Sequence, residues 1–313
     1  MRNKLLAKNT VASLIAQITT LICGFILPRL FLQHFGSEVN GLVNSIVQFL
    51  SVISFLELGV GAVVESSLYK PLAEKDNQQI SKVMVSANKF FQRLAQILFI
   101  YVLILMLVYP LIANQNLGFL YTATLIAAIS ISSFAQYYFG IANALLLNAD
   151  QRGYIQYNAQ TVTVVLNTAV CAVMISMNGT IQMVKLATSL IYLARPLALH
   201  FYVKRHYQID WKIKYTEEPI KQKWNGVAQH IAAVVLDGTD TIVLTVFSTL
   251  SNVSIYSVYF LVIKGVKTLF LSMTNGVQAL IGELWAKQEL EKLKGFFAWV
   301  EWVIHTGTTY VFS

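Results

Sequence analysis

Long apolar runs separated by short polar loops dominate the pattern of this chain. The runs cover roughly residues 10–32, 39–64, 91–113, 119–147, 154–177, 180–203, 225–247 and 253–277, and a ninth begins near Gly295. Each run is long enough for a membrane-spanning helix of about 20 residues, and none shows the alternation of a strand. Because only helices or closed barrels satisfy the backbone in lipid, the pattern predicts an all-α integral membrane protein, a polytopic helical bundle of about nine spans.

The composition agrees with a membrane protein. Hydrophobic residues make up 56% of the 313 residues and charged residues 12%. Soluble domains carry about 25% charged residues, so this chain cannot cover itself with a solvated surface. The net charge of +8 arises in short loops, which argues against a nucleic-acid partner. Cys23 and Cys171 lie inside apolar runs, and we interpret them as small hydrophobic residues rather than a disulfide or metal pair.

Basic and uncharged loops alternate along the chain. The N-terminus and the loops near residues 70–93, 148–153, 204–223 and 287–294 carry lysine or arginine. The intervening loops at 114–118, 177–180 and 248–252 carry no charge, and the loop around Phe35 carries no lysine or arginine. Because positive residues favour cytoplasmic loops, we expect a multi-pass protein with its N-terminus in the cytoplasm and an uncleaved first span.

Motifs for chemistry are absent from the sequence. The five histidines show no metal-ligand spacing, and no Ser-His-Asp, HExxH or paired-thiolate pattern occurs. The stretch GVGAVV at 59–64 lacks the third glycine of a dinucleotide loop. We therefore predict no enzymatic activity, no cofactor and no bound metal.

Two acids and two bases lie inside neighbouring apolar runs. Asp237 and Asp240 share one helical face of the seventh run, and Lys264 and Lys267 share one face of the eighth. The uncharged loop at 248–252 joins the two runs, which places Asp237 and Lys264 at a similar depth of about 15 Å. One reading is a structural ion pair; the other is an anion site with the acids as counter-ions or as a proton or sodium site.

Three further cations lie in or near the spans. Arg195 stands beside Pro196 in the sixth run, too far from the basic loop to snorkel, and we expect it to face an aqueous cavity between two lobes. Arg29 and Lys185 lie near the outer ends of their runs, where snorkelling to the surface is the simpler reading.

Uncharged polar residues form stripes on three of the predicted spans. The stripes comprise Asn40, Asn44, Gln48 and Ser51; Ser133, Gln136, Tyr137 and Gly140; and Tyr157, Gln160 and Asn167. Spacings of three and four residues place each set on one helical face. Two readings stay open, hydrogen bonds between helices and a hydrated vestibule for hydroxyl-rich ligands.

Several segments resemble a known transporter family. The stretch ILPRLFLQHFGSEVNGLVNSIVQFLSVISFLELGVGAVVESSLYKPLAEKD (26–76) is similar to the N-terminal signature of bacterial polysaccharide repeat-unit flippases. LLNADQRGYIQYNAQ (146–160) and VSIYSVYFLVIKGVKTLF (253–270) fit the same family. These O-antigen and capsular-polysaccharide flippases belong to the multidrug/oligosaccharidyl-lipid/polysaccharide exporter superfamily.

The resemblance implies two six-helix lobes in a V shape that work by alternating access in the bacterial cytoplasmic membrane. It implies a substrate of oligosaccharide on a polyprenyl diphosphate, turned from the inner to the outer leaflet, with membrane lipids, a glycan polymerase and glycosyltransferases as partners. By the same resemblance, cations in a cavity are expected to hold the diphosphate. The candidates in this chain are Arg29, Arg195, Lys264 and Lys267 for the substrate anion, Asn44, Gln48, Gln136, Tyr137 and Gln160 for other substrate contacts, and Asp237 and Asp240 for counter-ion or coupling roles.

The sequence departs from the family in length. Family members have twelve or more spans, whereas this sequence ends at TTYVFS inside its ninth. The resemblance therefore implies a C-terminally truncated chain, with a complete six-helix lobe over 1–217 and a partial lobe of about two and a half spans over 218–313. The alternatives are a cation-coupled drug antiporter of the same superfamily, a membrane glycan polymerase or ligase, and an inactive remnant.

Overall fold

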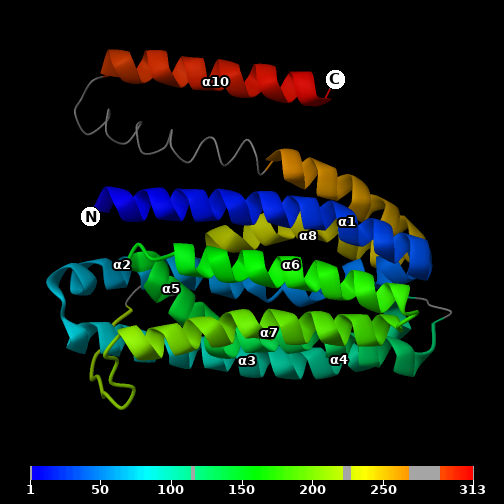
Figure 1. The fold of residues 1–313 in the computed structure, drawn as a ribbon, viewed down its shortest axis with the longest axis horizontal. Coiled ribbons are helices and arrows are strands. Elements are labelled where there is room, and N and C mark those ends of the chain that lie inside the picture. The colour runs from blue at the N-terminus through cyan, green and yellow to red at the C-terminus, as the bar shows by residue number, and fades with distance from the viewer. Residues whose placement is uncertain (1, 114–116, 221–226, 268–289, 313) are drawn as a thin grey trace. The chain divides into compact units, whose positions relative to one another are not determined.

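Helix is the only regular secondary structure in the part of the chain that the structure describes. The computed structural model describes residues 2–113, 117–220, 227–267 and 290–312 (Figure 1). No strand occurs within these ranges. The labelled elements are α1 (Arg2–Ser51), α2 (Ser54–Glu74), α3 (Asn77–Ile112), α4 (Phe119–Ala135), the π-helical η1 (Gln136–Gly140), α5 (Ile141–Ala149), α6 (Tyr154–Ser176), α7 (Ile181–His206), α8 (Val227–Phe247) and α10 (Leu290–Phe312). Residues 250–267 are also helical.

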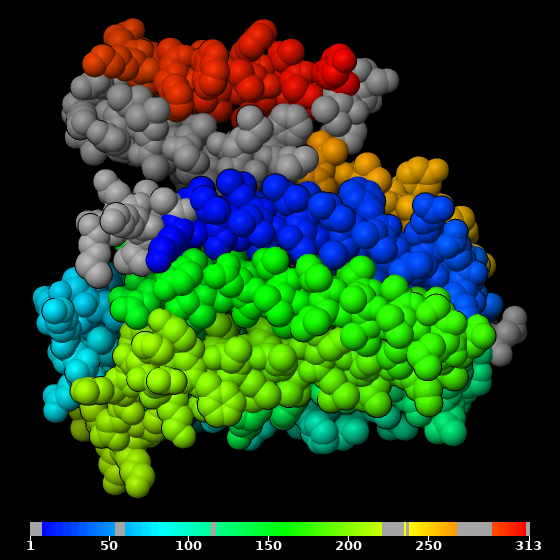
Figure 2. Space-filling view, in the orientation of Figure 1, coloured from blue at the N-terminus to red at the C-terminus, as the bar shows by residue number. Residues whose placement is uncertain are grey.

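The chain forms two compact units. The first unit, Met1–Ser257, contains α1 to α8, and the second unit covers Val258–Ser313. Within the first unit α1, α6 and α7 lie side by side, and Figure 2 shows them as adjacent bands from blue to yellow-green. The lobe boundary predicted near residue 217 stays a prediction.

Five helices are long and apolar enough to cross a membrane. They cover Lys8–Ser51, Asn77–Ile112, Phe119–Ala149, Tyr154–Ser176 and Ile181–His206. The last three match the apolar runs 119–147, 154–177 and 180–203, and α8 matches the run 225–247. The prediction of a helical membrane bundle is thus confirmed at this level, while the number of spans stays a prediction.

The outward face of α3 shows why this fold needs an apolar solvent. Ile100, Leu103, Leu107 and Leu111 recur at helical spacing and are between 47% and 79% exposed. Soluble proteins rarely leave contiguous apolar stripes of this kind in water. The opposite face of the same helix is buried, so α3 separates an exposed apolar surface from a protein core.

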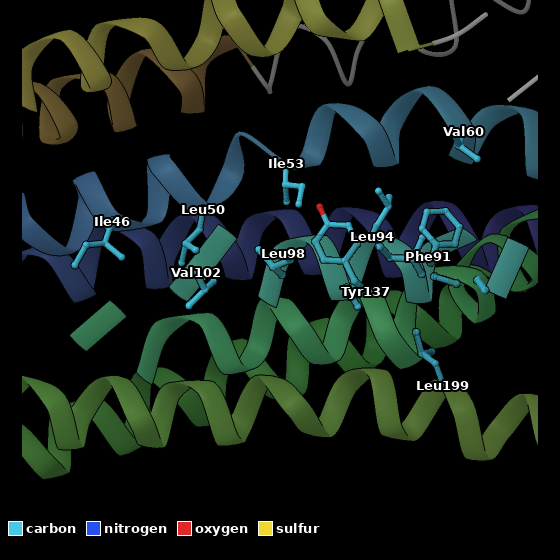
Figure 3. Packing of buried hydrophobic residues seen from close by; sticks show 14 of the residues in the cluster. Ile46, Leu50, Ile53, Val60, Phe91, Leu94, Leu98, Val102, Tyr137 and Leu199 are labelled. Atoms are coloured by element: carbon cyan, nitrogen blue, oxygen red, sulfur yellow. The ribbon is translucent and has the colours of Figure 1, made fainter. Parts of the chain in front are cut away.

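The core gathers where α1 ends and α2 begins. Leu50 and Ile53 pack in one cluster with Leu94 and Leu98 of α3 and Tyr137 of η1 (Figure 3). The second apolar run is interrupted here, because α1 ends at Ser51 and α2 restarts at Ser54. The carbonyl of Phe49 accepts a hydrogen bond of 3.0 Å from the hydroxyl of Tyr101, so a side chain partners the backbone beside the break.

The N-terminus of α3 lies well before the apolar run that predicted it. Asp76 caps the helix, and its side chain accepts a hydrogen bond of 3.0 Å from the backbone N–H of Gln79. A side-chain acceptor at this position satisfies an N–H that has no partner within the helix. Ile80, Val83 and Met84 then bury one face of the added turns, so the extension is an amphipathic part of the bundle.

Gly36 divides α1 into two helical segments. Its φ of 80° and ψ of 175° lie in a region that side-chain-bearing residues rarely adopt. No heavy atom lies within 4 Å of the position that a Cβ would take, so the backbone conformation and not the space requires glycine. The break falls in the loop predicted around Phe35 and gives the chain its first reversal after the N-terminus.

We predict that Gly36→Ala lowers the free energy of unfolding by about 1–3 kcal/mol, because alanine strains this conformation. Gly118→Ala is the matched control. Gly118 also has no neighbour within 4 Å of a Cβ, but its φ of −51° suits any residue. Unfolding of the two variants in mixed micelles measures the difference, and equal stabilities would contradict the assignment.

Candidate functional site

A cavity of about 520 Å³ lies inside the first unit. Its walls come from α1, α4, η1 and α7, all within the predicted N-terminal lobe. From α1 it is lined by Val47, Leu50 and Ser51, and from α4 by Ile129, Ser132 and Ser133. The cavity therefore combines an apolar wall with hydroxyl groups, which is the usual composition of a small-molecule site.

The polar wall of the cavity is one face of α7. Lys185, Thr188, Ser189, Tyr192 and Arg195 all line it. Their spacings of three, one, three and three residues place them in a single stripe. Ten residues of helix separate Lys185 from Arg195, a rise of about 15 Å. The two cations thus face the same cavity at two different depths.

A π-helical turn shapes the wall opposite α7. Gln136 and Tyr137 of η1 line the cavity. A Cβ on Gly140 would lie 2.8 Å from Oε1 of Gln136 and 3.0 Å from Cβ of Pro196. Glycine at position 140 therefore lets η1 approach α7 next to Arg195. π-Helical turns often occur at functional sites, because the extra residue redirects neighbouring side chains.

Lys185 is partly buried and has no carboxylate partner among the described residues. Its Nζ lies 4.2 Å from the centroid of the Phe31 ring, a cation–π contact. No aspartate or glutamate is among the described residues that line the cavity. Charges held in an apolar bundle without an opposite charge are costly. The cavity accordingly favours an anionic ligand.

The structure brings together three of the residues predicted for substrate contact, Arg195, Gln136 and Tyr137. Arg195 is partly buried on the cavity wall rather than at the helix end. The substrate role of all three stays a prediction, because the structure carries no ligand.

Four other candidates lie away from the cavity lining. Arg29 is exposed on α1, and Asn44 is partly buried there. Gln48 donates a hydrogen bond of 3.1 Å to Ser51 and packs against Gly238, where an added Cβ would meet its Nε2 at 2.3 Å. Gln160 donates to Thr20 at 3.4 Å. The contact of Gln48 with Gly238 joins α1 to α8, and the hydrogen bond of Gln160 with Thr20 joins α6 to α1.

Part of the predicted polar stripe on residues 40–51 serves helix packing. Asn40 donates a hydrogen bond of 2.7 Å to Ser254, and the hydroxyls of Ser45 and Thr245 are 2.7 Å apart. A Cβ on Gly41 would lie 1.7 Å from the carbonyl oxygen of Leu250, so the two backbones are in close contact. Small and hydroxyl-bearing residues are the usual means by which membrane helices associate.

The predicted pairing of acids and bases stays a prediction. Asp240 is exposed and accepts a hydrogen bond of 2.7 Å from the hydroxyl of Tyr256. The side chain of Asp237 lies outside the described residues. Lys264 and Lys267 are exposed in the second unit.

Sequence reasoning missed Lys185 and the hydroxyl groups beside it. It assigned Lys185 to snorkelling because of its place near the end of an apolar run. The sequence does contain a pattern that indicates this polar face. Polar residues at positions 185, 188, 189, 192 and 195 repeat at helical spacing. Cys23 and Cys171, in contrast, are buried free thiols as expected.

No protein-family model, curated protein or solved structure matches this chain.

Water access to the cavity can be tested with single cysteines after Cys23 and Cys171 are replaced by alanine. We predict that Ser133→Cys, on the cavity wall, reacts with a small charged thiol reagent at least about tenfold faster than Leu103→Cys on the outward face of α3. The thiolate is the reactive form and is disfavoured in hydrocarbon. Equally slow labelling of both cysteines in open membranes would show that the cavity is dry.

Proposed function

We propose that this protein is a flippase that moves polyprenyl-diphosphate-linked oligosaccharides from the inner to the outer leaflet of the bacterial cytoplasmic membrane. The observation that carries the proposal is a hydroxyl-lined cavity between apolar helices that holds two cations and, among the described residues, no acid. The resemblance of residues 26–76 to polysaccharide flippases supports the same assignment.

The cavity suits the polar head of such a substrate. Lys185 and Arg195 offer positive charge to the diphosphate, and hydroxyl groups on α4 and α7 offer hydrogen bonds to sugar hydroxyls. A volume of 520 Å³ lies in the range of small-ligand pockets, so it accommodates the head while the polyprenyl chain stays among lipids. A polyprenyl chain among lipids requires an apolar protein surface beside it, and the exposed apolar face of α3 is a surface of that kind.

The two cations explain how an anion can cross an apolar bundle. An unpaired charge in a low-dielectric interior is costly at every depth. Because Lys185 and Arg195 lie about 15 Å apart along α7, the cost is reduced at two levels rather than one. Alternating access would then expose the same stripe to each side of the membrane in turn. Lys264 and Lys267 remain candidates for contact with the substrate anion, and Asp237 and Asp240 remain candidates for a counter-ion or coupling-ion role.

The alternatives are less consistent with this cavity. A cation-coupled drug antiporter needs an acidic group where its cationic substrate binds, and the described lining contains none. A glycan polymerase or ligase needs a large outer loop for its catalytic groups, whereas the loops predicted to lie outside are short. A drug antiporter and a flippase also differ in the charge of the ligand, which provides the test.

We predict that the purified protein binds polyprenyl diphosphate more tightly than the matching polyprenol. Arg195→Gln or Lys185→Gln should weaken diphosphate binding by about 10- to 100-fold, because each removes a charge-assisted hydrogen bond. Binding of the two lipids in native mass spectrometry measures the preference. Lys185→Arg should retain it, and Lys70→Gln, a variant at an exposed position on α2, is the matched control.

The binding experiment separates the outcomes clearly. Equal binding of diphosphate and polyprenol would contradict the proposal, as would equal losses in Lys70→Gln and Arg195→Gln. If the binding result holds, transport is measured in liposomes by the exposure of a labelled lipid-linked oligosaccharide to a membrane-impermeant enzyme. Arg195→Gln should slow that exposure while Lys70→Gln leaves it unchanged.

A further inference from the structure

A second pocket lies between the N-terminal half of α3 and the C-terminal end of α7. It has a volume of about 250 Å³ and shares no lining residue with the cavity around Arg195. Asn88 and Gln92 contribute one helical face of α3, and His200 and Lys204 contribute one face of α7. The same π-helical turn that supplies Gln136 and Tyr137 to the cavity supplies the next two residues to this pocket.

Aromatic rings form much of the pocket wall. Phe139 lies against His200 with ring centroids 6.2 Å apart and planes at 67°, and Tyr138 lies 4.7 Å from Phe139. These edge-to-face contacts hold the rings in place. Trp211, in the segment after α7, is 42% exposed and completes the aromatic surface. Exposed aromatic faces of this kind bind the apolar side of a ring-shaped ligand.

Asn143 lines the pocket and carries an unused hydrogen-bond acceptor. The residue is 4% exposed, and its Nδ2 donates a hydrogen bond of 2.7 Å to the carbonyl of Phe139. That contact fixes the orientation of the amide, since a carbonyl can only accept. Oδ1 is buried and has no hydrogen-bond partner within the described residues. A buried acceptor without a partner is costly, so a ligand with an O–H or N–H donor would be bound here.

The charge of the pocket points to an acidic ligand. Lys204 is the only formally charged residue among its described lining residues, and no carboxylate is among them. Amide groups from Asn88 and Gln92 add donors and acceptors for hydroxyl groups. A pyranose with a carboxylate satisfies these features together, because it has an apolar ring face, several hydroxyl donors and one negative charge.

We propose that this pocket is a binding site for a single acidic pyranose, such as a hexuronic acid, with the sugar ring on Trp211 and a hydroxyl donating to Oδ1 of Asn143. The site goes beyond the cavity that carries the proposed function, and its occupancy can be measured without transport.

The test is a titration of the protein in lipid nanodiscs with glucuronate, followed by saturation-transfer NMR, since sugar-headed detergents would compete. Asn143→Ala and Trp211→Ala should each raise the dissociation constant for glucuronate at least about fivefold. Trp211→Phe should retain binding because the aromatic face is kept. Asn158→Ala, an exposed amide on α6, is the matched control. Trp211 lies outside the helices, so Trp211→Ala is expected to leave the helical bundle folded. This variant therefore tests the site even if Asn143→Ala lowers the stability of the protein.

Glucose and uridine are the comparison ligands. Weaker binding of glucose than of glucuronate, with the difference reduced in Lys204→Gln, is the expected result. Absence of saturable glucuronate binding, or unchanged dissociation constants in both pocket variants, would overturn the proposal. Equal binding of glucose would overturn the acidic assignment, and tighter binding of uridine would assign the aromatic wall to a nucleobase instead.

Discussion

The cost of holding positive charge inside an apolar bundle is the constraint on which the rest of this structure depends. Lys185 lies over the ring of Phe31 and lines the same cavity as Arg195, with no acid among the described lining residues. Hydrophobic replacement of Lys185 would favour the fold, because a buried charge without an opposite charge destabilises it. A ligand that brings the opposite charge accounts for the presence of this lysine on the cavity wall.

The helices around these cations are arranged to keep one polar stripe accessible. α7 presents its hydroxyl groups to α4 and η1, and Ser189 donates a hydrogen bond of 2.5 Å to the carbonyl of Ala128. Gly140 allows η1 to approach Pro196, while Gly41 and Gly238 allow close packing elsewhere in the first unit. Close contact at these glycines leaves the cavity as a defined space. The π-helical turn then directs successive residues into the cavity and into the pocket around Asn143.

Much of the helix pattern could be predicted because apolar length is a strong signal. The runs that became α4 to α8 were bounded within a few residues, whereas the N-terminal extension of α3 was missed because its turns are amphipathic rather than apolar. Helical spacing predicted which residues share a face, but it could not say what covers that face. Asn40 and Gln136 therefore looked alike in sequence, although one bonds to Ser254 and the other lines the cavity. The neighbours of Lys185 could not be predicted for a related reason, since position along a helix does not reveal what a side chain contacts.

The central claim is that Lys185 and Arg195 hold the anionic head of a lipid substrate inside the bundle. A structure of the full chain in lipid with bound polyprenyl diphosphate tests it most directly. The account predicts a phosphate oxygen within about 4 Å of Nζ of Lys185 or of the guanidinium of Arg195, the distance of an ion pair. A diphosphate located only among the lipid head groups, with the cavity occupied by water, would contradict the account.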